Sequence, residues 1–271
     1  MNHTSIRQVT SAANSLVKIY RRGLREGETR QGWLAIEGPH LIEEALRPGA
    51  RATVRSLLVT PEAAEKWRPL MVGLPPETEV AQVSAALFRQ ISQTEAPQGM
   101  AALVELAPPS LDSLLHLSNA LLLVAGGIQD PGNLGTMLRS AHALGAHALL
   151  TLHQSVSPLN PKAVRASAGA IFHLPVLASL DSQNLIMRLR EKRFRIVAAE
   201  SGGRVLLSET DLRGSVAFLI GREGSGLDAD LLRLADIRVK VPVRPGVDSL
   251  NASVAAGIFL YEAARQRQFN L

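Results

Sequence analysis

Three glycine-rich corners, far apart along the chain, carry the polar side chains best suited to binding and chemistry. The first follows an apolar run at 121–124 and holds Asp130 and Asn133, with Arg139 a little farther on. The run is short enough to be a strand buried on both faces, and good helix formers follow the corner. Open α/β sheets bind ligands where a strand's carboxyl end faces a helix amino terminus. The corner therefore predicts part of a ligand site.

Two later corners repeat this design. The apolar segment 216–220 runs straight into Gly-Arg-Glu-Gly-Ser-Gly at 221–226, which contains Glu223. The segment 237–243 leads to a loop that ends in Ser249 and Asn251, just before a long final helix. Loops at one edge of a parallel sheet converge in space. We therefore expect the polar groups of all three corners to build one site.

Several common sites are excluded by the motifs that the sequence lacks. No G-x-G-x-x-G follows a strand and no G-x-x-x-x-G-K-[ST] occurs, which argues against a standard dinucleotide fold and a P-loop. The chain has no cysteine and no H-x-x-x-H pair, so we expect no metal site. A tight turn would explain the glycines at 221–226 about as well as a ligand would. The conjunction of three such corners is what favours a site.

These corners resemble the three motifs of the SpoU (TrmH-type) RNA ribose 2′-O-methyltransferases. The matching stretches are Asn133-Leu134-Gly135-(x)3-Arg139, Leu219-Ile220-Gly221-Arg222-Glu223-Gly224-Ser225-Gly226, and Val241-Pro242 with Ser249-Leu250-Asn251-Ala252-Ser253. Arg165-Ala166-Ser167-Ala168-Gly169-Ala170 is also typical of the family. The resemblance covers roughly residues 115–271. One departure is Arg244-Pro245, where relatives more often have an apolar residue followed by a variable one.

The resemblance implies a fold, a cofactor and a set of site residues. It implies a carboxyl-terminal trefoil knot, a homodimer formed through the same domain, and S-adenosylmethionine as cofactor. The cofactor positions are Ile220, Gly221, Val241 and Leu250. The catalytic and substrate positions are Asn133, Arg139, Glu223, Ser249 and Asn251. Because a guanidinium stays protonated at neutral pH, we expect Arg139 to pair with a phosphate or a developing alkoxide rather than act as a base.

Each of these residues also has a purely structural interpretation. Asn133 suits a cap for a helix beginning at Leu134, and Glu223 suits a solvated turn. Ser249 and Asn251 suit caps of the last helix. These alternatives stay open from the sequence.

The amino-terminal part is predicted to be a separate RNA-binding domain. We expect the substrate-binding domain at 1–107, a linker at 108–114 around Pro108-Pro109, and the methyltransferase domain at 115–271. Ile36-Glu37-Gly38 and Pro97-Gln98-Gly99 are similar to the substrate-binding domain of many family members, whose fold resembles a small ribosomal protein. Residues through 55 include nine Lys or Arg against five acids, which suits phosphate contact or a solvated helix face. The candidate RNA-binding residues are Arg7, Lys18, Arg21, Arg22 and Arg165, the last of which suits a surface ion pair equally well.

Strands alternating with helices predict an α/β fold in both parts. In the first part we expect helices at 4–26, 40–46, 61–67 and 84–90, with strands at 32–36, 54–59 and 100–106. In the second we expect strands at 121–125, 147–152, 172–177, 195–199, 216–220 and 237–242, and helices at 134–144, 161–169, 182–192, 228–234 and 250–266. Such strongly apolar strands predict a mainly parallel sheet covered on both faces.

The favoured function is S-adenosylmethionine-dependent 2′-O-methylation of structured RNA, with ribosomal RNA preferred over transfer RNA. One rival is a catalytically silent RNA-binding protein, and another is a small-molecule α/β enzyme. The net charge of +5 and pI of about 10.1 favour an RNA partner. No apolar run is long enough for a membrane span and no signal peptide is visible, so we expect a cytoplasmic protein.

Overall fold

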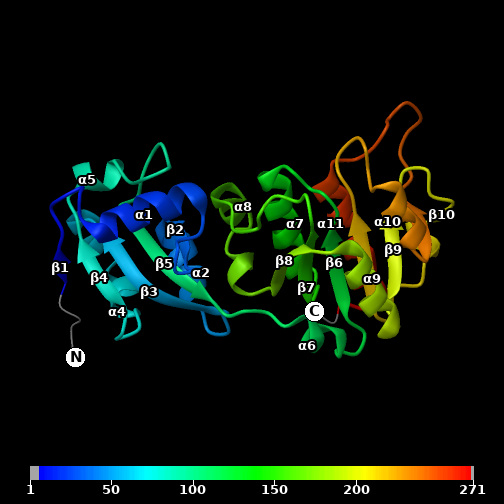
Figure 1. Cartoon of the computed structure of the whole chain (residues 1–271), viewed down its shortest axis with the longest axis horizontal. Helices are drawn as coiled ribbons and strands as arrows, with labels where there is room; N and C mark the ends of the chain where they lie inside the picture. Colours follow the sequence, from blue (N-terminus) through cyan, green and yellow to red (C-terminus); the bar gives the residue numbers. More distant parts are fainter. Residues whose placement is uncertain (1–5, 270–271) are drawn as a thin grey trace. The chain divides into compact units, whose positions relative to one another are not determined.

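The computed structural model describes residues 6–269, which form two compact units (Figure 1). The first unit holds the chain up to Ala107 together with Leu159–His173. The second holds Pro108–Pro158 and the chain from Leu174 onward. The chain first passes from one unit to the other after Ala107, and the segment Leu159–His173 returns to the first unit.

A mixed five-stranded sheet forms the centre of the first unit, in the order β1-β4-β3-β5-β2. Its strands are β1 Arg7–Gln8, β2 Leu34–Glu37, β3 Ala52–Val59, β4 Glu79–Gln82 and β5 Met100–Leu106. β3 pairs in parallel with β4 and antiparallel with β5. The helices of this unit are α1 Ser15–Glu26, α2 Pro39–Leu46, α3 Pro61–Lys66, α4 Arg68–Val72, α5 Ala85–Arg89 and α8 Pro161–Ala166, with a 3₁₀ turn η1 at Ala170–Phe172.

The first helix is shorter than the predicted 4–26. It begins after Asn14, whose side chain accepts a hydrogen bond from the Leu16 amide at 2.9 Å. Residues 7–8, predicted to be helical, instead pair in parallel with β4. The positions proposed as the helix cap, Thr4 and Ser5, lie outside the described residues.

The segment from Leu159 to His173 packs against the rest of the first unit through specific contacts. The Arg51 amide donates to the Phe172 carbonyl at 2.6 Å. The buried carboxylate of Glu44 accepts from His173 Nε2 at 3.2 Å and pairs with Arg47 at 3.0 Å. Gly169 lies directly against Glu44, since an added Cβ would come within 2.4 Å of the Glu44 Cγ. A glycine is therefore required at this contact.

The second unit is built on a seven-stranded sheet in the order β10-β12-β9-β11-β6-β7-β8, and every pair of neighbours is parallel. Its strands are β6 Leu121–Ala125, β7 Ala148–Leu152, β8 Val176–Leu180, β9 Arg195–Ala199, β10 Val205–Leu206, β11 Val216–Ile220 and β12 Ile237–Lys240. Every residue of β6 and β11 is buried, as their continuous apolar sequences require. The predicted mainly parallel sheet is confirmed.

Helices cover both faces of this sheet (Figure 1). They are α6 Leu111–Leu115, α7 Pro131–Ala143, α9 Ser182–Glu191, α10 Ala229–Leu234 and α11 Ala252–Gln266, with a 3₁₀ turn η2 at Leu207–Glu209. α6, α9 and α10 pack on the face that carries Leu122 and Leu219. α7 and α11 pack on each other and on the sheet, where Phe259 meets Phe218 edge to face at 5.3 Å between ring centroids.

Two segments of the second part differ from expectation. The strand predicted at 172–177 begins only at Val176, because η1 occupies its start and Pro175 has no amide hydrogen to donate. The segment predicted as linker contains α6, whose cap is Ser110. The short elements β4, α4, β10 and η2 also have no counterpart in the prediction.

Arg267, just after α11, ties the end of this helix to the sheet. Its guanidinium donates to the carbonyls of Asn119, Leu212 and Gly214 at 2.5, 3.0 and 2.6 Å. These carbonyls precede β6 and β11, the two strands at the middle of the sheet. Half-burial lowers the pKa of Arg267, but a guanidinium still remains charged in a protein.

We expect Arg267→Ala to lower the free energy of unfolding by about 2 kcal/mol, because three carbonyls lose a charged donor. Denaturant unfolding followed by circular dichroism measures this. Arg213→Ala is the matched control, since Arg213 forms an exposed ion pair with Asp211 and its loss should change stability little. Equal stabilities of the two variants would contradict the role given to Arg267.

Candidate functional site

The three glycine-rich corners meet at the carboxyl ends of β6, β11 and β12. β6 and β11 are neighbours in register, with Ile220 opposite Ala125, so their following loops start at the same level. Asn133 Nδ2 donates to Glu223 Oε1 at 2.9 Å, and Asn251 Nδ2 donates to Asn133 Oδ1 at 3.0 Å. Asn251 Nδ2 also bonds to Glu223 Oε1. Residues 118 positions apart in sequence thus form one hydrogen-bonded cluster.

Asn251 serves two purposes at once. Its Oδ1 caps α11 by accepting from the amides of Ser253 and Val254 at 2.9 and 3.2 Å. Its Nδ2 faces the other way, toward Asn133 and Glu223. The cap predicted as the structural alternative therefore exists together with the cluster.

The cap of α7 is Asp130 rather than Asn133. The Asp130 carboxylate accepts from the Asn133 amide at 2.8 Å, and the helix starts at Pro131, three residues earlier than predicted. The idea that Asn133 caps a helix beginning at Leu134 is therefore wrong. The Asn133 side chain is left available for the cluster. Within the part of the chain that the structure describes, Glu223 Oε2 makes no hydrogen bond, so this oxygen is open to a ligand.

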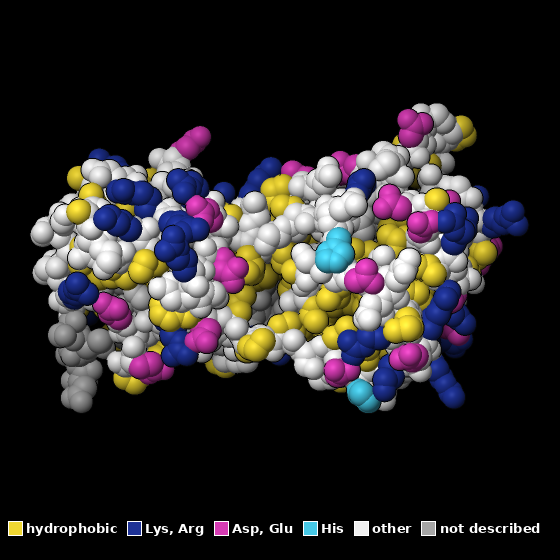
Figure 2. All heavy atoms as spheres, viewed as in Figure 1, with side chains coloured by type: hydrophobic (Ala, Val, Ile, Leu, Met, Phe, Trp, Pro, Cys, Tyr) yellow, Lys and Arg dark blue, Asp and Glu magenta, His cyan; other side chains and the backbone are white. Residues whose placement is uncertain are grey.

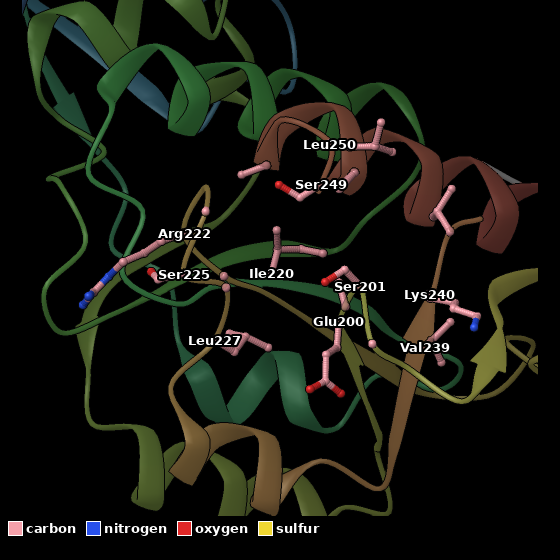
Figure 3. A pocket seen from close by; sticks show the side chains of 18 of the residues that line it. Glu200, Ser201, Ile220, Arg222, Ser225, Leu227, Val239, Lys240, Ser249 and Leu250 are labelled. Atoms are coloured by element: carbon pink, nitrogen blue, oxygen red, sulfur yellow. The ribbon is translucent and has the colours of Figure 1, made fainter. Parts of the chain in front are cut away.

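A cavity of about 260 Å³ lies beside this cluster (Figure 3). All four predicted cofactor positions, Ile220, Gly221, Val241 and Leu250, line it, and so does Ser249. Its walls combine these side chains with apolar ones from β12 and α11, such as Val239 and Phe259. This mixture of glycine backbone, apolar walls and a few polar groups fits an adenosine-containing cofactor.

The glycine loop after β11 forms a tight, backbone-lined part of the cavity wall. Arg222 and Gly226 exchange two backbone hydrogen bonds, each of 3.0 Å. A Cβ at Gly221 would lie 2.2 Å from the Gly226 carbonyl carbon, so no larger residue fits there. Gly224 and Gly226 have φ of 77° and 69°, which favours glycine.

A second cavity of about 360 Å³ adjoins the first. Its lining is polar for the most part and consists of Ile128, Gln129, Asp130, Asn133, Arg222, Glu223, Ser225 and Ala252. Arg222, Ser225 and Ala252 line both cavities. A molecule in the first cavity and another in the second would therefore be neighbours, with Asn133 and Glu223 on the side of the second.

Arg139 is not brought into this cluster. It is exposed on α7, six residues beyond Asn133, which at 3.6 residues per turn places it on a different side of the helix. It lines neither cavity, and it has no hydrogen bond or ion pair to any residue from 6 to 269. The six-residue spacing was a signal of this separation, because the side chains of such a pair lie on different sides of a helix.

The candidate RNA-binding residues belong to the first unit. Lysine and arginine side chains gather over α1 in Figure 2. On this helix Lys18 and Arg22 are exposed, and Arg22 pairs with Glu26 at 2.6 Å. Arg21 is half-buried, and its Nε has no hydrogen-bond partner among the described residues. Arg7 lies on β1, where it pairs with Glu79 at 3.4 Å.

Arg165 belongs to the first unit, whereas the three corners belong to the second. It is exposed on α8, in the segment that packs with the first unit, and no ion pair involves it within residues 6–269. The surface ion pair considered from the sequence is therefore not formed among the described residues.

Sequence reasoning missed Glu200 and Ser201, which also line the first cavity. Both follow β9, a strand whose bounds were predicted as observed. Their position at the carboxyl end of a parallel strand was the signal that could have found them.

No group of three or more metal-ligating side chains occurs among residues 6–269. The helices described for this chain include none that is long and apolar enough to cross a bilayer.

Two adjoining cavities at the carboxyl ends of parallel strands are typical of α/β enzymes that bind a cofactor or substrate there. The model of the SpoU rRNA Methylase family matches residues 120–261, and that of the MRM3-like substrate binding domain matches residues 14–102. The chain belongs to the SpoU rRNA methylase family.

Relatives of known activity cover nearly the whole chain. The 23S rRNA (guanosine(2553)-2′-O)-methyltransferase RlmP of Bacillus subtilis is 30% identical over 94% of this chain and 98% of its own. The 23S rRNA (uridine(2479)-2′-O)-methyltransferase of Streptomyces viridochromogenes is 31% identical over 90% of this chain and 87% of its own. The crystal structure of the SpoU methyltransferase AviRb from Streptomyces viridochromogenes, in complex with AdoMet, superposes with a TM-score of 0.84 at 29% identity and covers 94% of this chain and 98% of that one.

We expect Asn251→Asp to separate the two purposes of this side chain. Aspartate caps helices as well as asparagine does, so the unfolding free energy should change by less than about 1 kcal/mol. An ionised carboxylate cannot donate to Asn133 or Glu223 and would repel the latter, so methyl transfer should fall by at least about a hundredfold. Denaturant unfolding and single-turnover methyl transfer measure the two effects. Loss of stability with full activity would contradict this assignment.

Proposed function

We propose that this protein transfers a methyl group from S-adenosylmethionine to a ribose 2′-hydroxyl of ribosomal RNA. The observation that carries this proposal is the cluster of Asn133, Glu223 and Asn251 beside two adjoining cavities. Relatives named as 23S rRNA 2′-O-methyltransferases support the reaction and the class of RNA. A neighbour of the same fold that holds AdoMet supports the cofactor.

The first cavity would hold the cofactor. Ile220, Gly221, Val241 and Leu250 provide its walls, and Ser249 adds a hydroxyl. The cofactor supplies an electrophilic methyl group on a sulfonium. The residues shared by the two cavities, Arg222, Ser225 and Ala252, stand where this methyl group would face the ribose. Holding both molecules in line converts an encounter into a reaction within one complex.

Glu223 would receive the hydrogen bond of the ribose 2′-hydroxyl. Its Oε1 is fixed by the amides of Asn133 and Asn251, which leaves Oε2 for the substrate. Two fixed donors orient the carboxylate before the substrate arrives. The hydroxyl proton then leaves toward Glu223, the phosphate or solvent.

Arg139 would act as a fixed cation for the RNA phosphate or the developing alkoxide. A second copy of the chain provides a way to bring it to a site, since it is exposed and points to neither cavity of its own chain. We infer a homodimer through the second unit, formed by α7 and α11. Exposed apolar side chains on α11, Val254 at 50% and Tyr261 at 52%, support this surface.

The same proposal includes a trefoil knot in the second unit, as the family resemblance implies. Threaded chains are very rare, so physical reasoning from the sequence would not have suggested one. The close approach of the segment after β9 to β12 is consistent with a threaded loop, because a Cβ on Gly203 would lie 2.9 Å from the Val239 carbonyl carbon.

The first unit would hold the structured RNA through the exposed cations of α1 and its surroundings. The match of residues 14–102 to a substrate-binding domain supports this. We favour ribosomal over transfer RNA because the named relatives act on 23S rRNA. A cytoplasmic location follows from that substrate.

The direct test is transfer of tritium from labelled S-adenosylmethionine to total RNA, followed by mapping of 2′-O-methyl positions in cells with and without the gene. We expect one position in ribosomal RNA to be methylated in cells that have the gene and unmethylated in cells that lack it. RNA binding without any transfer would favour the catalytically silent alternative. If a methyl group is lost from transfer RNA instead, the proposed reaction stands but its substrate is transfer RNA.

Arg139→Lys should lose most turnover yet keep cofactor affinity. Lysine retains the charge but not the planar fork that grips phosphate with two hydrogen bonds. Single-turnover kinetics and calorimetric titration of the cofactor measure the two effects. Near-normal turnover of this variant would show that two hydrogen bonds from the Arg139 guanidinium to a phosphate are not needed.

Mixing two inactive variants tests whether Arg139 serves the partner's site. Arg139→Ala and Glu223→Gln dimers should each be inactive, but exchanged subunits would give heterodimers with one intact site. Random exchange should then restore about one quarter of the wild-type activity, since half the dimers are mixed and half their sites are intact. Unfolding and refolding the two variants together, with each alone as the control, provides the measurement. No recovery would place Arg139 in its own chain's site.

A further inference from the structure

The first cavity is also lined by a carboxylate, that of Glu200, which lies outside the three family motifs. Glu200 follows β9 directly and lines the cavity together with Gly221. β9 and β11 are parallel neighbours, with Ala198 opposite Leu219. Continuing that register by two residues puts Glu200 opposite Gly221, where the glycine loop begins. Glu200 therefore stands at the same edge of the sheet as the other cavity residues.

The backbone of Glu200 is fixed, whereas its carboxylate is open. Its amide donates to the Val239 carbonyl at 3.0 Å, and its carbonyl accepts from the Gly203 amide at 2.9 Å. The half-buried side chain has no hydrogen bond or ion pair within residues 6–269. Figure 3 shows it directed to the Leu227 side of the cavity, with the Lys240 ammonium pointing away from it. A carboxylate in such a place favours a ligand that donates hydrogen bonds.

The other residues of the cavity indicate which hydrogen-bond donor Glu200 would bind. Leu227, Leu232 and Val239 line the same cavity as Glu200, and such apolar side chains suit a flat base. The part of an adenosine next to its base is the ribose, whose two neighbouring hydroxyls match the two oxygens of a carboxylate. In other parallel α/β sheets, an acid at a strand's carboxyl end accepts from the ribose of a bound nucleotide.

We propose that Glu200 binds the ribose 2′- and 3′-hydroxyls of the cofactor's adenosine and thereby sets affinity for the nucleoside part of the cofactor. This inference rests on the proposed function, because it needs the cofactor in the first cavity. Glu200 is a binding residue and takes no part in the proton transfer. It acts equally on the cofactor and on its demethylated product, since both contain the same ribose.

Calorimetric titration of the full chain with S-adenosylhomocysteine and with its 2′-deoxy and 3′-deoxy analogues tests this. Removing the carboxylate in Glu200→Ala should weaken binding of S-adenosylhomocysteine roughly tenfold to a hundredfold. The wild type should lose a similar factor on at least one deoxy analogue. For Glu200→Ala, the affinities for S-adenosylhomocysteine and for that deoxy analogue should differ by less than about threefold, because the carboxylate that would bind the hydroxyl is already gone.

Two further variants keep the result interpretable. Glu200→Gln preserves the shape and one acceptor oxygen, so we expect a smaller loss and unchanged folding. Glu191→Ala removes an exposed carboxylate at the end of α9 and should bind like the wild type. 5′-Methylthioadenosine lacks the amino-acid part, and its binding should still depend on Glu200.

Each contrary result is distinct. If the Glu200 effect persists with both deoxy analogues, the ribose is not its partner. If it vanishes for 5′-methylthioadenosine, Glu200 recognises the amino-acid end, which overturns the inference and leaves the proposed function intact. If the wild type binds neither S-adenosylmethionine nor S-adenosylhomocysteine, both are overturned.

Discussion

The site depends on the side chain of Asn251, which makes bonds in two directions. One end fixes the start of α11, and the other joins Asn133 and Glu223. The position of the last helix is thus coupled to the geometry of the other two corners. A shift of α11 that broke this link would leave Glu223 with a single orienting donor. Such a shared residue holds the side chains of the three corners in one arrangement.

The sheet brings these corners close because its central strands are parallel and level. β6 and β11 pair along their whole length, so their loops leave the sheet side by side. Burial of both strands on both faces prevents a slip of register, since a slip would exchange every side chain between the two helical layers. The same alignment places the end of β9 next to the glycine loop, which is how Glu200 reaches the first cavity.

Much of this arrangement could be predicted from the sequence. The strands β6, β9 and β11 have the predicted bounds, because continuous apolar runs between polar loops leave little choice. The meeting of Asn133, Glu223 and Asn251 follows from parallel strands and one shared edge. Short elements such as β1 and β10 were missed because two residues carry no periodic signal. The exposed position of Arg139 depends on how a helix packs. The start of the strand predicted at 172–177 is instead occupied by the turn η1, which belongs to the first unit.

The segment from 159 to 173 belongs to the first unit although it lies between two stretches of the second unit in the sequence, so the units cannot be separated by one cut in the chain. The chain passes from one unit to the other three times, near residues 107, 158 and 173, rather than once through a simple linker. A fragment that starts at residue 108 would expose Val164, Ile171 and Phe172, which are buried in the whole protein. Exchange of the amino-terminal unit during evolution, or by recombination in the laboratory, would therefore have to preserve this packing as well. The two units are therefore constrained to change together.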